Sequence, residues 1–157
     1  MLYTKYPAQI TNIKGEYYIS FRDIPDLQTL PKSSYEECLL HAKDSLSDYL
    51  NKNITENTDA YKGPTKQFFI PIPSKVRVGE VLISPDLKTS ISTLLKLVRK
   101  EENISAFEAS KLIGVKPHNY RKIENALSNN MRIENVEKYF NALGYEIAFE
   151  LKRLTDD

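Results

Sequence analysis

The stretch between Ser105 and Leu127 restricts the fold of this chain most, because it predicts two short helices that meet at a single glycine. Ser105 and Glu108 have the spacing of a capping box, in which each side chain accepts a hydrogen bond from the other residue's backbone N–H. Gly114 stands where a left-handed residue ends many helices. A second helix is expected from about Pro117, because proline at the first helical position removes no intrahelical hydrogen bond.

Both predicted helices have an apolar inner face. The residues that form it, with one from the turn, are Ala109, Leu112, Ile113, Val115, Tyr120, Ile123 and Leu127. Their helical spacing places them on one side of each helix. Two such helices around a glycine turn are typical of a helix-turn-helix, whose second helix enters the major groove of DNA.

The outer face of the second helix carries side chains that suit DNA recognition. These residues are Lys116, His118, Asn119, Arg121, Lys122 and Asn125. Arginine and lysine contact phosphates or guanine, and asparagine pairs with adenine through two hydrogen bonds. Four cations and no carboxylate lie from Lys111 to Lys122, although the 157-residue chain has a formal net charge of only +1. The basic face predicts DNA binding, and the alternative is a generic helical domain with a solvated basic surface.

Residues 105–125 resemble the helix-turn-helix of the Cro/repressor type. The resemblance rests on the leucine–glycine–valine turn around Gly114 and on the pair Ile123–Glu124 near the end of the second helix. The chain departs from that pattern at Ala109–Ser110, where leucine–alanine is usual, and around Ala126, where a glycine is usual. These departures leave the expected fold in place and the base specificity open.

Residues 1–80 have the alternating pattern of strands instead. Apolar residues alternate within 6–10 and 17–21 on either side of a glycine turn, which predicts an antiparallel hairpin. A further strand is expected at Phe68–Ile72, at a sheet edge or ending there, because two prolines in this region have no N–H to donate. A short additional strand at Leu27–Leu30 is left open.

A helix is predicted between these strands, with a capping box at Ser34 and Glu37. Apolar residues at helical spacing follow as far as Leu50, so this helix can cover one face of the sheet. Its opposite, solvent-facing side is expected to carry Glu36, Lys43, Asp44 and Ser47.

The chain is therefore predicted to be α+β with two domains, residues 1–80 and 81–157. The first is a small antiparallel sheet with one covering helix, and the second is all-α and ends in a short β-strand. Residues 74–85 fit a strand, a helix or a linker. Ser84 and Pro85 have the residue types of an N-cap and a first helical position, so a helix is expected to begin there.

Four apolar residues alternate after the last predicted helix and indicate a final strand: Tyr145, Ile147, Phe149 and Leu151. This strand either closes the core of its own domain or pairs with its twin in a second copy. The second interpretation is preferred, because one edge strand after four helices has no obvious partner in its own chain. A twofold dimer of this kind would present two recognition helices to a palindromic DNA site.

The first 50 residues are similar to the HicB antitoxin family. The similarity rests on the run from Tyr17 to Thr29, where a strand ends in an aromatic residue before an Asp-x-Pro-Asp loop, and on the helix and proline-flanked strand that follow. The resemblance implies a partial RNase H-like fold without nuclease activity. It also implies a HicA-type toxin as partner, a small mRNA interferase whose catalytic histidine the antitoxin occludes. The antitoxin would form a dimer or tetramer and repress its own operon.

The residues themselves argue against catalysis. An RNase H-type nuclease gathers several carboxylates around two metal ions, whereas the strands of the first half contain few acidic residues. Asp23 and Asp26 lie in a loop, either as turn formers or as acceptors for a basic toxin surface, and the first interpretation is preferred for each. The single cysteine excludes an intrachain disulfide, and no Cys/His cluster has the spacing of metal ligands. No catalytic residue, metal or cofactor is expected.

No apolar stretch approaches the roughly 20 residues that a membrane span requires, and the first residues lack a signal-peptide pattern. A cytoplasmic protein without a membrane partner is therefore expected. Two functions compete. One is an antitoxin that binds its toxin through the first domain and operator DNA through the second. The other is a stand-alone repressor whose first domain senses a ligand or oligomerises, and a nuclease is a third alternative.

Overall fold

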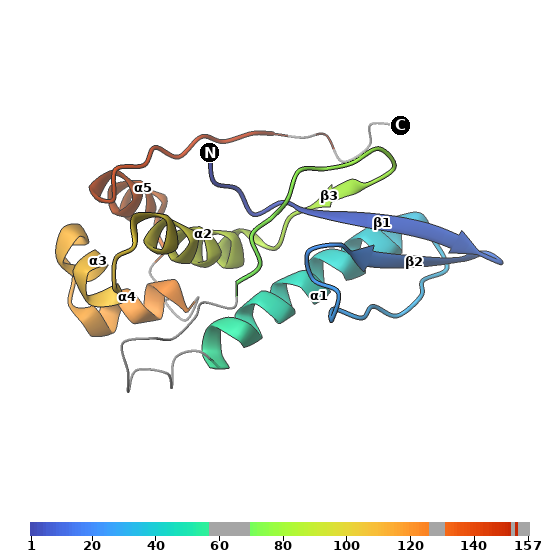
Figure 1. Ribbon diagram of the computed structural model, residues 1–157, viewed down its shortest axis with the longest axis horizontal. Coiled ribbons are helices and arrows are strands. Elements are labelled where there is room, and N and C mark those ends of the chain that lie inside the picture. Colours follow the sequence, from blue (N-terminus) through green and yellow to red (C-terminus); the bar gives the residue numbers. More distant parts are fainter. Residues whose placement is uncertain (57–69, 126–130, 152, 154–157) are drawn as a thin grey trace.

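The computed structural model describes residues 1–56, 70–125, 131–151 and 153 of the chain. In these ranges the chain forms three strands and five helices, and the predicted α+β class is confirmed (Figure 1). The elements are β1 Tyr6–Ile13, β2 Glu16–Phe21, α1 Tyr35–Glu56, β3 Val81–Ile83, α2 Leu87–Glu102, α3 Ala106–Ile113, α4 Pro117–Glu124 and α5 Ile133–Ala142.

β1 and β2 form the predicted antiparallel hairpin, with Ile13 opposite Glu16 across a two-residue turn. Lys14 and Gly15 occupy the turn with φ angles of 53° and 88°. Two successive positive φ angles give a tight turn the twist that paired strands need, and glycine takes such an angle at no steric cost. The Gly15 N–H donates to the Asn12 side-chain oxygen at 3.0 Å, which adds a local contact within the turn.

The third strand is β3, which pairs antiparallel with the other edge of β1 and gives the strand order β2–β1–β3. The strand predicted at Phe68–Ile72 is wrong where it can be compared: residues 70–72 form no strand, and the first two of its residues lie outside the described part. Two prolines deprive this segment of ladder donors. The backbone of this segment has no regular secondary structure. The Tyr6 hydroxyl donates a hydrogen bond to the Pro71 carbonyl at 2.9 Å and fixes the segment to β1.

The loop between β2 and α1 closes the free edge of β2. Tyr17 and Lys32 exchange two backbone hydrogen bonds in an isolated bridge, and the Thr29 hydroxyl donates to the Ile19 carbonyl at 2.9 Å. The candidate strand at Leu27–Leu30 is therefore not a strand, because side chains and one bridge satisfy this edge in its place.

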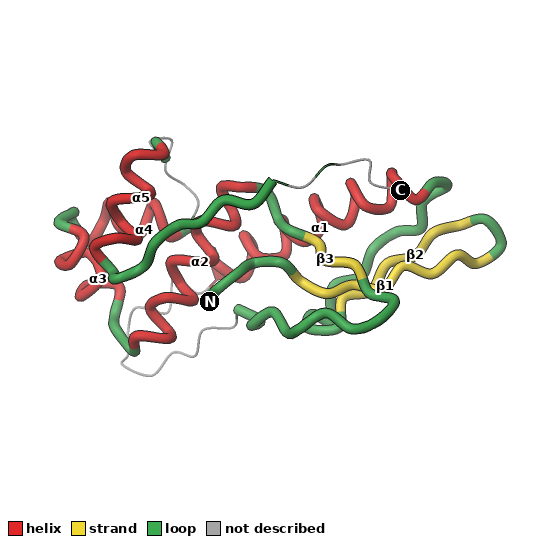
Figure 2. Tube along the Cα trace, turned by 90° about the horizontal axis from the view of Figure 1, so that it is seen from above, coloured by secondary structure: helices red, strands yellow, loops and turns green. Residues whose placement is uncertain are grey.

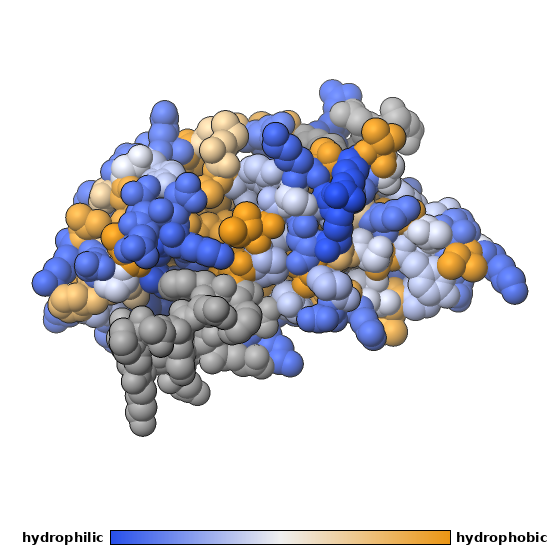
Figure 3. Space-filling model, in the orientation of Figure 1, coloured by the Kyte–Doolittle hydropathy of each residue, from blue (hydrophilic) through white to orange (hydrophobic). Residues whose placement is uncertain are grey.

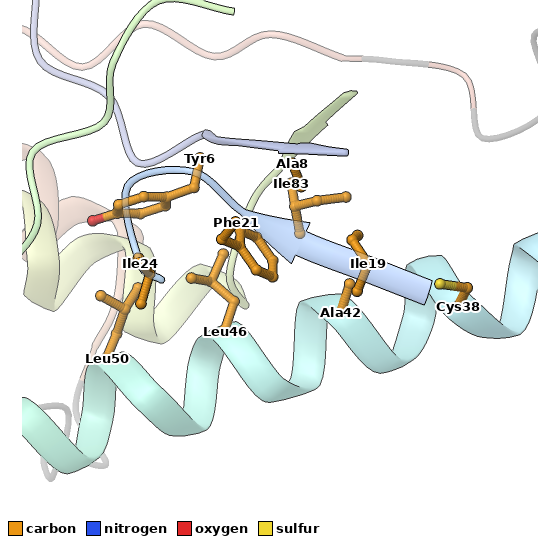
Figure 4. Close-up of a cluster of buried hydrophobic side chains, with 10 residues drawn as sticks. All are labelled: Tyr6, Ala8, Ile19, Phe21, Ile24, Cys38, Ala42, Leu46, Leu50 and Ile83. Carbon is orange, nitrogen blue, oxygen red and sulfur yellow. The ribbon is translucent and has the colours of Figure 1, made fainter. Parts of the chain in front are cut away.

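α1 covers one face of the sheet and closes the first core, as predicted (Figure 4). Its contribution recurs every four residues along the helix, at Cys38, Ala42, Leu46 and Leu50. The sheet and the loop after it contribute Tyr6, Ala8, Ile19, Phe21, Ile24 and Ile83. Ser47 was expected on the outer face of α1, but it is buried because the residues that lead into α2 lie against it.

The helices after β3 pack around a second core, at the end of the molecule opposite the hairpin (Figure 2). Its buried residues are Leu95, Val98, Ala109, Tyr120, Ile123, Val136, Phe140 and Leu143. α2 begins at Leu87, later than the start expected at Ser84–Pro85. The reason is local: Asp86 takes the N-cap position and its side chain accepts from the Thr89 N–H at 2.8 Å.

Residues 145–151 form no strand within this chain, so the predicted final strand is wrong for the single molecule. Tyr145 and Ile147 pack half-buried against the second core, whereas Phe149 and Leu151 are 74 % and 99 % exposed. The segment runs back along the N-terminal residues (Figure 1), where Glu150 pairs with Lys5 at 2.5 Å. Among the described residues, the sheet consists of β2, β1 and β3, and this segment does not join it.

Within the described ranges, no helix combines the length and apolar composition that crossing a membrane requires. The division into domains at residues 80 and 81 stays a prediction. The sheet continues past that point, because β3 belongs to it.

Candidate functional site

α3, a glycine turn and α4 are placed where the sequence predicts them. The capping box at the start of α3 is complete: the Glu108 N–H donates to the Ser105 hydroxyl at 3.1 Å, and the Ser105 N–H donates to the Glu108 carboxylate at 2.7 Å. This backbone hydrogen bond, more than any other contact, lowers the pKa of Glu108. Gly114 has a φ of 80° and its N–H donates to the Ser110 and Lys111 carbonyls. α4 then begins at Pro117.

The inner faces of these helices agree with prediction except at one residue. Ala109, Tyr120 and Ile123 are buried, and Ile113 and Val115 pack half-buried against them. Leu112 is 57 % exposed, so its expected place in the core is wrong. Ser110 is buried in its place, with its hydroxyl donating to the Phe107 carbonyl. Leu127 lies outside the described residues.

The six residues predicted to face DNA all reach the surface of α4 or its ends. Lys116, His118, Asn119 and Lys122 are exposed, and Arg121 and Asn125 are half-buried. His118, Lys122 and Asn125 follow the i, i+4, i+7 spacing of one line along a helix. Hydrophilic residues are interspersed with hydrophobic ones at the helical end of the molecule on the side seen in Figure 3. The structure thus gathers the predicted side chains on one short helix with a solvent-facing side.

Glu124, the carboxylate at the end of α4, is turned away from that surface. It is 5 % exposed and forms a two-pronged ion pair with Arg99 of α2. The Arg99 Nε donates to Glu124 Oε2 at 2.8 Å, and Nη2 donates to Oε1. The pair neutralises the carboxylate inside the protein, so Glu124 adds no exposed negative charge beside the cations of α4.

A second contact also ties the end of α4 to α2. The Ser92 hydroxyl donates to the Ile123 carbonyl at 2.9 Å, and both residues are buried. Sequence reasoning missed Ser92 and Arg99, because 31 and 25 residues separate them from their partners. The available hint was Glu124 itself, an acidic residue inside an otherwise cationic and apolar segment.

Lys96 lies one turn before Arg99 on α2 and is 5 % exposed. Burial lowers the pKa of its ammonium to about 8; nearby Glu124 opposes this shift and Arg99 adds to it. For Arg99, burial works to lower the pKa, but the hydrogen bonds and charge of Glu124 outweigh burial and raise it. Three charged groups therefore share the interior between α2 and α4.

In the first half, the loop carboxylates predicted as possible toxin contacts have different surroundings. Asp23 accepts hydrogen bonds from the Ser74 N–H and the Ser74 hydroxyl, both at 2.7 Å. Its carboxylate thus anchors the segment that leads to β3, a longer-range contact than the local turn-forming role preferred from sequence. Asp26 is exposed. Across the described ranges, no three His, Cys, Asp or Glu side chains lie close enough together to hold a metal ion.

Part of the chain matches a known protein family. The family model of the HicB-like antitoxin of bacterial toxin–antitoxin systems matches residues 5–97, which is more than half of the chain. The match covers the sheet, α1 and most of α2, and it stops before α3. No curated protein matches the chain.

Proposed function

The chain belongs to the HicB-like antitoxin family of bacterial toxin–antitoxin systems, and from this membership we propose that it neutralises a HicA-type mRNA interferase and represses its own operon. Family membership supports the toxin partner. The outward face of α4 supports operator binding and is the observation that carries this part of the proposal. Both roles are binding roles in the cytoplasm, and the chain itself breaks no bonds.

On DNA, α4 lies in the major groove with its exposed line toward the base edges. His118, Lys122 and Asn125 occupy the middle of that surface, and Asn119 and Arg121 flank it. Central side chains of a recognition helix reach bases, whereas flanking ones reach phosphates and fix the register. The helix-turn-helix formed by α3 and α4 is thus the operator-binding element of the antitoxin.

The toxin binds the N-terminal half, which has a partial RNase H-like fold. Asp26 offers a free-standing carboxylate in the loop after β2 for a basic toxin surface. Asp23 takes part through the same loop, although its oxygens already bind Ser74. The antitoxin covers the catalytic histidine of the toxin, so that messenger RNA cannot reach it.

The functional unit is a dimer or a tetramer. Phe149 and Leu151 are exposed on an extended segment, and pairing this segment with its twin would bury both side chains. Burial of apolar area is worth about 25 cal/mol per Å². Such a twofold assembly presents two copies of α4 to a palindromic operator.

A gel-shift assay with the DNA upstream of the protein's own gene tests the operator role. We expect Arg121→Ala/Lys122→Ala to lose retention of that DNA, because two cations leave the recognition face. Lys100→Ala/Lys138→Ala is the matched control, since it removes two exposed cations from other helices. The affinity of the wild type should fall steeply with salt, with a log–log slope of about −0.9 for each phosphate contact. Unimpaired retention by the α4 variant would remove α4 from the interface.

A further inference from the structure

α2 is shared by the two halves of the molecule, and its first turn is tied to α1 by partly buried polar contacts. The Asp86 N–H, just before α2, donates to the Ser47 hydroxyl of α1 at 2.9 Å. The Ser47 hydroxyl in turn donates to the Lys43 carbonyl at 2.9 Å. Ser47 is 6 % exposed, so the hydroxyl has found both a donor and an acceptor inside the protein.

Asn51, one turn further along α1, makes the second contact between α1 and the start of α2, a region called the junction below. Its side-chain amide donates to the Thr89 hydroxyl at 3.0 Å, and that hydroxyl donates to the Asp86 carboxylate at 2.8 Å. Burial would raise the pKa of Asp86, but the hydrogen bonds that its carboxylate accepts from the Thr89 N–H and hydroxyl work against burial, and the pKa is lowered. Leaving buried partners of this kind unsatisfied costs free energy, so α1 and the start of α2 resist separation.

The same helix also holds α4, the proposed recognition helix, through Ser92 in its first half and Arg99 near its end. Ser92 binds the Ile123 carbonyl and Arg99 binds the Glu124 carboxylate. Between the two ends, Leu97 of α2 packs with Ile70 and Leu2 from the N-terminal half. An α-helix of 16 residues is a stiff rod of about 24 Å. A rod fixed to α1 at its first turn and to α4 from Ser92 to Arg99 holds the two helices in a fixed relative position.

We propose that Ser47 and Asn51 are positioning residues for the recognition helix, acting through α2. The sheet, α1 and the helices of the second half then form one rigid body. The consequence for DNA rests on the proposed function: a toxin on the sheet half is carried at a fixed position relative to the operator. The rigid junction itself does not rest on that function. The family match through residue 97 is consistent with it, because it includes the shared part of α2.

Distances between spin labels in the full chain test the junction without DNA. Labels are placed on the exposed positions Thr11 of β1 and Lys138 of α5 through Thr11→Cys and Lys138→Cys, in a Cys38→Ala background. Double electron–electron resonance should give one narrow distance peak. Ser47→Ala/Asn51→Ala should broaden this peak and weaken operator binding, although neither residue belongs to the α4 surface. Ser47→Thr, which keeps the hydroxyl, should retain the narrow peak.

Ser45→Ala is the matched control on α1, because the Ser45 hydroxyl shares a hydrogen bond with His41 of its own helix and takes no part in the contacts with α2 described above. A broad distribution of label distances in the chain with Ser47 and Asn51 intact would overturn the proposal. So would a peak in Ser47→Ala/Asn51→Ala that is as narrow as that of the intact chain. If the double variant does not melt cooperatively, the single variant Ser47→Ala takes its place: a broadened distance peak supports the proposal and an equally narrow peak overturns it. Failure of the unaltered chain to bind its operator would contradict the proposed function and leave the distance result standing.

Discussion

The residues between α2 and α4 show how a charged interior fixes the position of a surface. Arg99 and Glu124 are each about 5 % exposed, and each supplies the other's counter-charge. A buried ion pair is no large source of stability in itself, but removal of one partner leaves an uncompensated charge in the interior. The free energy of unfolding and the orientation of α4 therefore depend on both residues together.

Glu124→Gln should lower the free energy of unfolding by roughly 3–5 kcal/mol, because it leaves the Arg99 guanidinium buried without a counter-charge. Urea unfolding followed by circular dichroism measures this loss. Arg99→Met/Glu124→Gln should recover much of it, since the unpaired charge is then gone. A double variant as unstable as the sum of the two single variants would show that the pair has no special coupling.

Lys96 predicts a pH dependence of stability with a definite sign. Its pKa is about 8 in the folded protein and 10.5 in the unfolded chain. Between these values the unfolded chain binds more protons, so the Lys96 contribution to stability rises with pH from about 8 to 10.5. Lys96→Met should stabilise the protein at pH 7 by roughly 1–3 kcal/mol. The variant should gain less from a shift to pH 9.5 in thermal melts, and equal gains in both proteins would refute a buried charged lysine.

At the scale of elements, the sequence was most informative where local chemistry decides the structure. The Ser105 capping box, the Gly114 turn and the Pro117 start lie where they were predicted. The third strand was predicted at the wrong residues, because a segment becomes a strand only where a neighbouring strand offers a free edge to pair with. Val81–Ile83 fits the free edge of β1, whereas the proline-flanked segment before it lacks the donors.

The candidate DNA surface was predictable for the same reason, since exposed residues on a short helix follow from its apolar stripe. Leu112 shows the limit of this argument. In a helix of eight residues, positions three and four after Ala109 are both compatible with the inner face, so the spacing does not distinguish Leu112 from Ile113. Contacts between residues distant in the sequence, such as Arg99 with Glu124 or Ser47 with Asp86, leave no periodic trace. They had to be seen in the structure.

The terminal segment makes a prediction about assembly. Phe149→Glu/Leu151→Glu should shift the protein from dimer toward monomer in light scattering, because both exposed side chains are proposed to pair with a second copy. Tyr145 and Ile147 are left unchanged, since they pack on the chain's own core. Ala148→Glu is the control for added charge on an exposed neighbouring position. An unaltered molecular mass would place the oligomer contact elsewhere.

At the scale of the whole molecule, the sheet with α1 and the candidate DNA surface occupy opposite ends of one chain (Figure 2). The hairpin, β3 and α1 form one end, and α3, α4 and α5 form the other, with α2 in contact with both. This arrangement separates the two proposed binding surfaces, so that a toxin on the sheet would leave the exposed side of α4 accessible. The proposed function therefore predicts that the protein holds its toxin and its operator at the same time.

The most direct test is co-purification of the protein with the product of the adjacent reading frame, followed by DNA retention of the complex. We expect the wild type and Arg121→Ala/Lys122→Ala to hold and neutralise that product equally, and only the wild type to retain operator DNA. Absence of any complex with the neighbouring product, or loss of toxin and DNA binding together in the α4 variant, would contradict two separate binding surfaces.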